Sequence, residues 1–157
     1  MKKMTPERAK QLAMTCHTDS SFLAEYLPPS NEVNNASGEE GIHISIVQWL
    51  SKVTTDGLLK AVWYHVPNQW DGQVNNIFGA RMRRQGKLNG VADLSFAWET
   101  GSGFIEVKQP KTGRLSPFQM LFKEWCALTK VFYEVVYSVE DTKDTLVKWG
   151  LLPVDRC

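Results

Sequence analysis

The sequence predicts an α/β or α+β fold, in which helices pack against one central sheet. From Gly38 onward the predicted elements follow the order helix, three strands, helix, strand, helix. Elements in such an order pack as layers around a shared core. The chain has 157 residues, 43% hydrophobic and 22% charged, so one domain is large enough to bury that core without disulfides.

The helices are predicted from capping residues and apolar stripes. The first long helix spans residues 38–53, and Ser138 begins the last one. Between them Ser116-Pro117 begins another helix, because a polar cap followed by proline is typical of a helix start. Trp49 and Trp125 lie on apolar helix faces, and we therefore expect both tryptophans in the core.

Four runs rich in β-branched and aromatic residues are predicted as strands. They span residues 58–66, 91–99, 103–109 and 131–138. The second and third are expected to form a hairpin through the Thr-Gly-Ser-Gly sequence between them. A further short helix is expected across the basic residues 80–85.

The chain is expected to comprise an N-terminal extension and linker (residues 1–37, with two short helices) and a main domain (residues 38–157). Cys16, Cys126 and Cys157 are too few and too widely spaced to predict a disulfide framework or a zinc site. No apolar run has the length of a signal peptide or a membrane span. These features predict a cytoplasmic protein that is not secreted and has no membrane partner.

Positive charge is concentrated between Ala80 and Arg114, although the whole chain has a net charge of only +1. The stretch holds three acidic residues and seven basic ones: Arg81, Arg83, Arg84, Lys87, Lys108, Lys111 and Arg114. Clustered lysine and arginine side chains attract polyanions and release counterions from nucleic acid. A solvated surface has the same composition, so basic residues alone identify only a candidate phosphate-binding surface.

The predicted hairpin brings two carboxylates together. Glu106 and Lys108 lie on one face of their strand because side chains alternate, and Asp93 lies beside Glu106 in the neighbouring strand. Close carboxylates repel unless a cation lies between them, and Mg²⁺ or Mn²⁺ prefers such oxygen ligands. Lys108 is then placed to act on a water molecule or on developing negative charge. The alternative is a structural aspartate with a Glu106–Lys108 ion pair on an edge strand.

These residues belong to a longer pattern that resembles one family. In order, the chain has Glu39 ahead of IVQWL, HVPN at 65–68, ARMRRQGK at 80–87, GVAD at 90–93, EVK at 106–108, GRLS at 113–116 and Gln119. The pattern is similar to the virus-type replication-repair nuclease (VRR-NUC) domain of the PD-(D/E)XK nuclease superfamily, over about residues 38–150. Ala92 stands where that family commonly has proline, which affects rigidity before Asp93 rather than the chemistry.

The resemblance implies a restriction-endonuclease-like core with a mixed sheet, and metal-dependent hydrolysis of DNA that leaves 5′-phosphates. Mg²⁺ or Mn²⁺ is expected on Glu39, Asp93, Glu106 and the main-chain carbonyl of Val107. The expected catalytic residues are Asp93, Glu106, Lys108 and Gln119. The expected DNA contacts are His65, Asn68, Arg81, Arg83, Arg84, Lys87, Lys111, Arg114 and Ser116.

The resemblance also bears on partners and cellular role. Small members resemble junction resolvases that act as homodimers, because two symmetric nicks need two sites. It therefore implies a DNA-repair enzyme on branched or duplex DNA, in the cytoplasm or nucleoid of a bacterial or phage-infected cell. Two other classes stay open: a non-catalytic DNA-binding module, and an adaptor whose carboxylates are ion-paired.

Helical geometry separates the two glutamates of the first long helix. At about 100° per residue, Glu39 falls on the same face as Ile42 and Ile46, whereas Glu40 points away. The sequence Ser37-Gly38-Glu39-Glu40 also matches a capping box, in which Glu40 reaches back to the Ser37 amide. We therefore expect Glu39 to bind the metal, since a carboxylate that faces a core needs a partner.

Gln119 and His65 each have a structural role to weigh against a functional one. The sequence from Ser116 to Gln119 is itself a capping box, so Gln119 is expected to cap its helix, to serve the site near Lys108, or both. His65, at a strand end, is either a hydrogen-bonded histidine or a substrate contact. No function is expected for His43.

Overall fold

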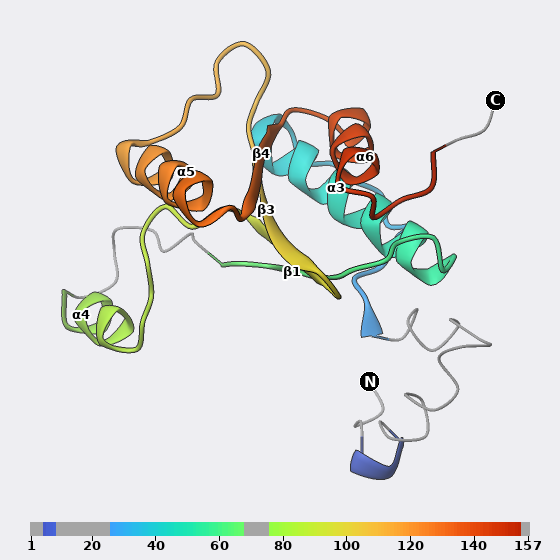
Figure 1. Cartoon of the computed structure of the whole chain (residues 1–157), viewed down its shortest axis with the longest axis horizontal. Coiled ribbons are helices and arrows are strands. Elements are labelled where there is room, and N and C mark those ends of the chain that lie inside the picture. The colour runs from blue at the N-terminus through green and yellow to red at the C-terminus, as the bar shows by residue number, and fades with distance from the viewer. Residues whose placement is uncertain (1–4, 9–25, 68–75, 155–157) are drawn as a thin grey trace.

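The computed structural model describes residues 5–8, 26–67 and 76–154 and has an α+β architecture (Figure 1). Within these residues a four-stranded mixed sheet has the spatial order β1-β2-β3-β4. The strands are β1 (Val62–His65), β2 (Leu94–Trp98), β3 (Gly101–Val107) and β4 (Phe132–Val136). The pairs β1–β2 and β2–β3 are antiparallel, whereas β3–β4 is parallel. The predicted class, helices around one central sheet, is confirmed.

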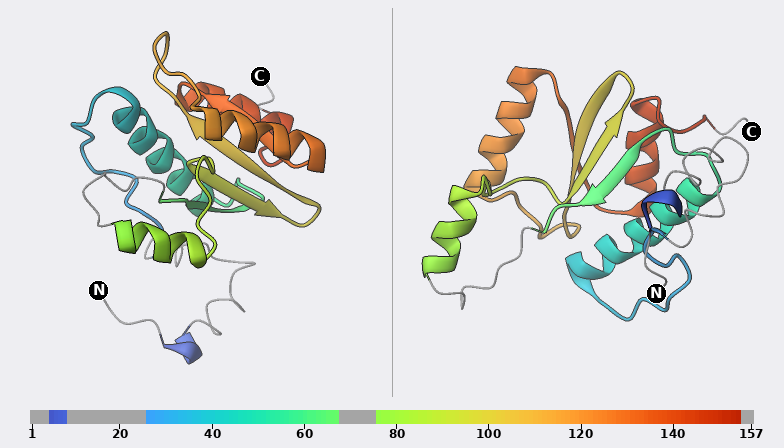
Figure 2. Two further views of the ribbon diagram at one scale, coloured as in Figure 1. Left: turned by 90° about the vertical axis from the view of Figure 1, so that its left-hand side faces the viewer. Right: turned by 90° about the horizontal axis from the view of Figure 1, so that it is seen from below.

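Helices cover both faces of the sheet. The helices α3 (Gly38–Thr55) and α6 (Val139–Lys148) lie side by side on one face, and α5 (Pro117–Thr129) lies on the opposite face (Figure 1). Because β3 and β4 are parallel, they need a long crossover connection, which α5 supplies. The basic helix α4 (Asn76–Arg84) stands apart from the sheet, on the same side as α5 (Figure 2).

The core lies between the sheet and the α3–α6 layer. Its fully buried apolar members are Ile46, Leu50, Leu94, Phe96, Ile105, Val107, Val136 and Leu146. Burying each large side chain contributes about 1.5–3 kcal/mol. Trp149 closes this core over Gly103, where an added Cβ would lie 2.7 Å from the Trp149 ring. The ring therefore requires glycine at this point of β3.

Several strand boundaries differ from the sequence prediction, including the starts of β1, β2 and β3. The first strand starts at Val62 rather than at residue 58, because the Leu58 amide donates to the Val53 carbonyl at the end of α3 (2.9 Å) and the Lys60 amide donates to the Leu151 carbonyl (2.9 Å). The strand β3 starts two residues earlier than predicted, at Gly101. Glu99-Thr100 thus forms the hairpin loop.

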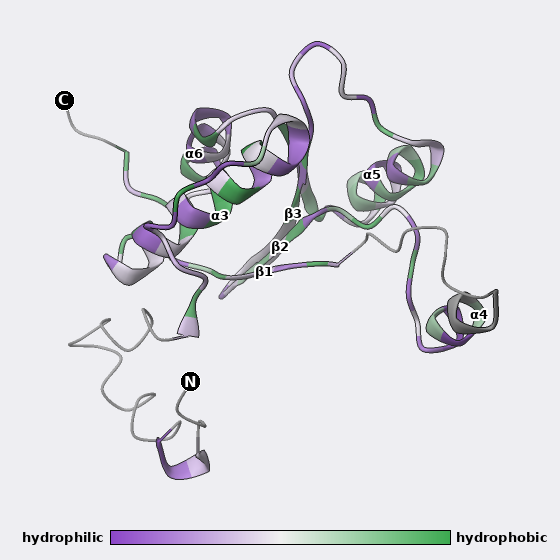
Figure 3. Cartoon of the chain, turned by 180° about the vertical axis from the view of Figure 1, so that it is seen from behind, coloured by the Kyte–Doolittle hydropathy of each residue, from purple (hydrophilic) through white to green (hydrophobic). Residues whose placement is uncertain are grey.

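Hydrophobic residues recur along α5 (Figure 3), but only one flank of the helix packs against the sheet. Phe122 packs edge-to-face against Phe104 of β3, with 5.0 Å between ring centroids, and Cys126 is buried. Trp125, predicted as a core residue, is 56% exposed. The prediction fails because the sheet covers the flank with Phe122 and Cys126, and Trp125 lies on the next flank. Trp49 is partly buried against the core, as expected.

The end of the predicted linker is attached to α3. Asn34 Nδ2 donates to the Gly41 carbonyl (2.7 Å) and to Ser45 Oγ (2.9 Å), and Gln48 Nε2 donates to the Glu32 carbonyl (2.7 Å). These bonds hold residues 32–34 against the main domain, while the predicted boundary at residue 37 stays a prediction.

Some predictions concern residues outside the described ranges. They include most of the second N-terminal helix, and Asn68, Cys16 and Cys157. Cys126 is a free, buried thiol. None of the described helices combines the length and apolar character needed to cross a bilayer.

Candidate active site

The sequence-predicted acidic residues meet at one end of the sheet. Glu39 lies in the first turn of α3, Asp93 immediately precedes β2, and Glu106 lies near the end of β3. The register pairs Leu94 with Ile105, which places Asp93 opposite Glu106. The strand β3 lies between β2 and β4. The alternative that placed the Glu106–Lys108 ion pair on an edge strand is therefore wrong about the position of the strand.

Glu106 is a fully buried carboxylate with one oxygen satisfied and one not. Its Oε1 accepts from Lys108 Nζ at 2.7 Å and from Gln119 Nε2. Within the described part of the chain, its Oε2 is buried and has no hydrogen-bond partner. Burial raises the pKa of Glu106 to about 7, the charge of Asp93 adds to this effect, and Lys108 opposes it.

Lys108 lies between two carboxylates. Its Nζ is 2.7 Å from Glu106 Oε1 and 3.0 Å from Glu39 Oε1, and its side chain is only 8% exposed. Burial alone would lower the pKa of Lys108, but the hydrogen bonds and charges of Glu106 and Glu39 raise it above its ordinary value. The side chain is therefore a fixed ammonium group, suited to stabilising negative charge rather than to removing a proton.

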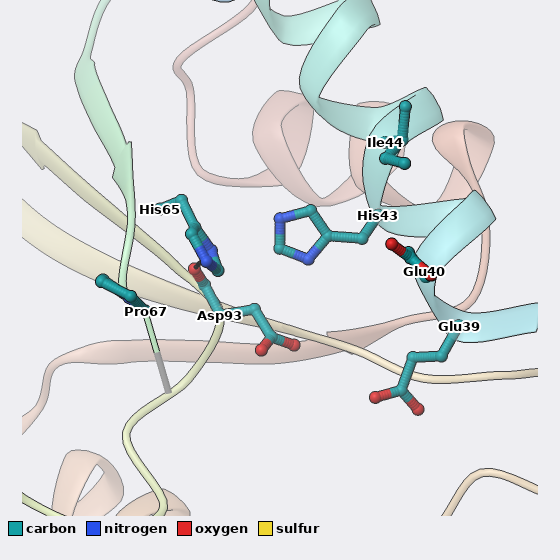
Figure 4. Close-up of a pocket in the computed structure, with 7 residues that line it drawn as sticks. All are labelled: Glu39, Glu40, His43, Ile44, His65, Pro67 and Asp93. Carbon is teal, nitrogen blue, oxygen red and sulfur yellow. Dashed lines mark hydrogen bonds between the residues drawn. The ribbon is translucent and has the colours of Figure 1, made fainter. Parts of the chain in front are cut away.

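Asp93 is positioned by its neighbours on both sides. Its Oδ2 accepts from the Val107 amide (2.9 Å), and its main-chain carbonyl accepts from the Val66 amide (2.9 Å). His65 Nδ1 lies 3.0 Å from the same carbonyl, so a proton on Nδ1 would donate there. These contacts tie the aspartate to β1 and β3, and Figure 4 shows its carboxylate pointing into an open pocket.

That pocket has a volume of about 310 Å³ (Figure 4), and one of its lining residues, Glu39, contacts Lys108. Its lining comprises Glu39, Glu40, His43, Ile44, His65, Pro67 and Asp93. His43 and His65 pack edge-to-face with ring centroids 4.8 Å apart. Burial lowers the pKa of His43 despite the nearby charge of Asp93, which favours the neutral imidazole.

No role for His43 was expected from the sequence. One signal was present, because residues four apart on a helix share a face and His43 follows Glu39 by four positions. The contact between His43 and His65, however, depends on how α3 crosses the end of β1.

Glu39 and Glu40 occupy different positions in the structure, but the capping box expected from the sequence does not explain the difference. The predicted capping box at Ser37 is wrong, since Ser37 makes no side-chain cap hydrogen bond. Gly38 has a φ of +65°, so the first turn lacks the regular geometry that the box needs, and the Glu40 side chain lines the pocket. Glu39 does not face the core either, since its side chain is 44% exposed, but it reaches Lys108.

Gln119 caps its helix, as predicted, and the same side chain also contacts Glu106. Its amide N–H donates to Ser116 Oγ (3.2 Å), and its side-chain Oε1 accepts from the Ser116 amide (2.8 Å), which completes the capping box of α5. The other end of the same side chain, Nε2, donates to Glu106. The cap therefore aims Gln119 at the buried carboxylate.

The predicted DNA contacts are spread over several elements. Arg81, Arg83 and Arg84 are exposed on α4 and Lys87 follows it, whereas Lys111 and Arg114 are exposed in the loop between β3 and α5. Ser116 caps α5. The structure does not bring the α4 arginines to the pocket that His65 and Asp93 line.

The available donor atoms are of the chemical type that a hard divalent cation prefers. Asp93, Glu106 and Glu39 offer carboxylate oxygens, the ligands that Mg²⁺ and Mn²⁺ prefer, and Glu106 Oε2 is unpartnered. Over residues 5–8, 26–67 and 76–154, no three acidic, histidine or cysteine side chains are close enough to hold an ion together. Mg²⁺ often takes only one or two carboxylates, with water and substrate phosphate as its other ligands. The Val107 carbonyl as a ligand stays a prediction.

No family model, curated protein or solved structure matches this chain. The fold and site together define an α+β protein with a buried carboxylate–lysine cluster at one end of a mixed sheet.

Proposed function

We propose that this protein is a divalent-metal-dependent DNA endonuclease with a PD-(D/E)XK core of the VRR-NUC kind. The observation that carries the proposal is the buried Glu106, whose Oε2 has no partner in the described residues while Asp93 lies opposite. A buried, unsatisfied carboxylate destabilises a fold. A cation bound there would satisfy it.

The acidic residues would hold Mg²⁺ or Mn²⁺, with Asp93 and Glu106 as the principal ligands and Glu39 as a further one. When bound, such an ion acts as a Lewis acid towards phosphate and lowers the pKa of bound water. The Lys108 ammonium stabilises negative charge that develops on the scissile phosphate. Gln119 fixes the orientation of Glu106 through its Nε2 contact, and the basic residues 81–87 and 111–114 hold the phosphate backbone.

Two observations support DNA as the substrate: the family resemblance and the distribution of positive charge. Exposed arginines on α4, together with Lys111 and Arg114, favour a phosphate backbone longer than one nucleotide. The resemblance to resolvase-like nucleases favours branched DNA and action as a homodimer.

A second candidate is an ion-paired adaptor or a DNA-binding module without catalysis. The contacts of Lys108 with Glu39 and Glu106 favour it, because they pair the charges without any metal. Metal titration separates the two candidates. Mn²⁺ raises the melting temperature of a metal-binding nuclease, since a ligand that binds only the folded state stabilises it, and leaves an ion-paired adaptor unchanged.

The decisive experiment is a cleavage panel on four-way junction, flap, duplex and single-stranded DNA with Mg²⁺, Mn²⁺ or EDTA. Cleavage should require a metal, and Asp93→Asn or Glu106→Gln should lower its rate by at least about 100-fold, the loss expected when one charge-stabilising group is removed. DNA binding should survive both changes.

The matched control is Glu99→Gln, which removes a carboxylate from the exposed hairpin loop and should cleave normally. Near wild-type cleavage by either Asp93→Asn or Glu106→Gln would exclude the proposed centre.

A further inference from the structure

A groove between α5 and the end of α4 lies outside the carboxylate–lysine site. Its volume is about 270 Å³. One wall is formed by Phe118, Leu121, Phe122 and Trp125 of α5, and Arg83 and Lys87 line the other side. Phe118, Leu121 and Trp125 are 57%, 63% and 56% exposed. Large apolar side chains gathered at an exposed surface typically mark a binding site.

The groove has the size and the surface for a flat ring. An apolar cavity of about 150 Å³ is enough to hold benzene, so this groove has room for a nucleobase. Trp125 and Phe118 supply aromatic surface, on which bases of any sequence can stack. Asn89 also lines the groove and offers an amide to a base edge.

The charges at the groove favour a polyanion over an ordinary protein surface. Arg83 and Lys87 line it, Arg81 and Arg84 are exposed on the same helix, and none of the described residues that line the groove is acidic. A ligand that complements both features has flat apolar rings joined by phosphates, as in an unpaired strand of DNA.

A second cavity adjoins this groove on the side of Gln119. It has a volume of about 230 Å³, shares Phe118 and Asn89 with the groove, and extends to Ser116 and Gln119. Gln119 in turn contacts Glu106. The loop after α4 approaches α5 closely. A Cβ added to Gly90 would lie only 2.3 Å from the Phe118 carbonyl carbon.

We propose that this groove binds unpaired nucleotides of the DNA substrate. Their bases stack on Trp125 and Phe118, and their phosphates contact Arg83 and Lys87. The inference rests on the proposed nuclease function and narrows its substrate class to DNA with an unpaired segment, such as a flap, rather than continuous duplex.

The test measures binding by fluorescence anisotropy in EDTA, which prevents metal-dependent cleavage. Two dye-labelled oligonucleotides of equal length are compared, one of thymidines and one of abasic sites, so that the phosphate charge is the same. Stacking contributes about 1–3 kcal/mol per base, so the wild-type protein should bind the thymidine strand about 5- to 150-fold more tightly for each stacked base.

Two variants locate the effect. Trp125→Ala should remove the preference for bases and leave binding of the abasic strand unchanged, whereas Arg83→Ala should weaken binding of both strands equally. The matched control is Leu128→Ala, a residue that is 82% exposed on the same helix and does not line the groove. It should retain the preference.

Equal wild-type affinity for the two strands, or a preference that survives Trp125→Ala, would overturn the inference. So would a Trp125→Ala variant that dissociates an oligomer without changing DNA binding, because the groove would then be a protein interface. Base-dependent binding without metal-dependent cleavage contradicts only the nuclease function, whereas cleavage without base-dependent binding contradicts only the groove.

Discussion

At the scale of single residues, the buried Glu106–Lys108 pair is not explained by a contribution to the stability of the fold. Both side chains are buried and lie 2.7 Å apart. Replacing a buried ion pair with apolar residues of similar volume is often neutral or stabilising, so the pair is weak support for the fold. The proposed catalytic role, with Glu106 Oε2 available to a cation, would account for it.

The stability of the metal-free protein should depend on pH through Glu106. Burial and Asp93 raise the pKa of Glu106 from 4.5 to about 7, so the folded state holds a proton that the unfolded chain releases between these values. The Glu106 contribution to the free energy of unfolding therefore falls as pH rises from about 4.5 to 7. In EDTA near pH 8, Glu106→Gln should be more stable than wild type by on the order of 1–3 kcal/mol.

Thermal melts of both proteins across this pH range measure the effect. The two stability curves should converge towards the acidic end, where Glu106 is protonated and resembles glutamine. Curves that stay parallel would show that Glu106 does not titrate in this range.

The two glutamates of α3 should differ in their response to metal. Glu39→Ala should reduce the increase in melting temperature on adding Mn²⁺ and lower single-turnover cleavage, because it removes a carboxylate that contacts Lys108. Glu40→Ala should spare cleavage and cost less than the roughly 1 kcal/mol of a lost cap, since Ser37 makes no side-chain cap bond. If Glu40→Ala loses the metal response and Glu39→Ala keeps it, Glu40 is the ligand.

At the scale of elements, different parts of the α5 surface make different contacts. Its first turn is held by the Ser116–Gln119 capping box and aims Gln119 at Glu106. Phe122 and Cys126 pack towards the sheet, whereas Trp125 and Leu128 face solvent. The helix α5 therefore contacts the proposed site at its first turn and presents an exposed aromatic side chain, Trp125, further along.

The helix α4 should act as a phosphate-binding element. Replacing Arg81, Arg83 and Arg84 with alanine should weaken binding to every DNA shape and reduce the slope of log K against log salt by up to about 3, near one unit for each lost phosphate contact. Affinities over a salt titration with duplex and junction DNA provide the measurement. An unchanged slope would mean that these arginines are solvated surface.

At the scale of the whole molecule, the mixed sheet brings distant segments together. The hairpin β2–β3 aligns Asp93 with Glu106, and the antiparallel partner β1 delivers His65 to the Asp93 carbonyl. The crossover through α5 returns Gln119 to the same end of the sheet. The proposed site therefore depends on the register of β1, β2 and β3.

If the resemblance to junction resolvases holds, the active molecule should be a homodimer. Light scattering should then give twice the chain mass of 17.8 kDa, and a four-way junction should be cut by two symmetric nicks, because each protomer supplies one site. A monomer that makes single nicks would contradict the resolvase-like action and leave the metal chemistry untouched.

The parts of the site that could be predicted depend on local geometry. Alternation along a strand places Glu106 with Lys108, and a short hairpin places Asp93 beside Glu106. The capping box at Ser116 is likewise a contact between residues three apart. The similar pattern at Ser37 failed because the positive φ of Gly38 distorts that turn, which the letters of the motif do not reveal.

The sequence by itself determined the fold class, the span of the first long helix to within two residues, the starts of α5 and α6, and the Asp93, Glu106 and Lys108 cluster. Only the tertiary structure decided that Lys108 lies between Glu39 and Glu106, that His43 meets His65, and that Trp125 is exposed. The reason is physical. Periodicity fixes which side chains share a face of one element, but contacts across 69 positions, as between Glu39 and Lys108, depend on how separate elements pack.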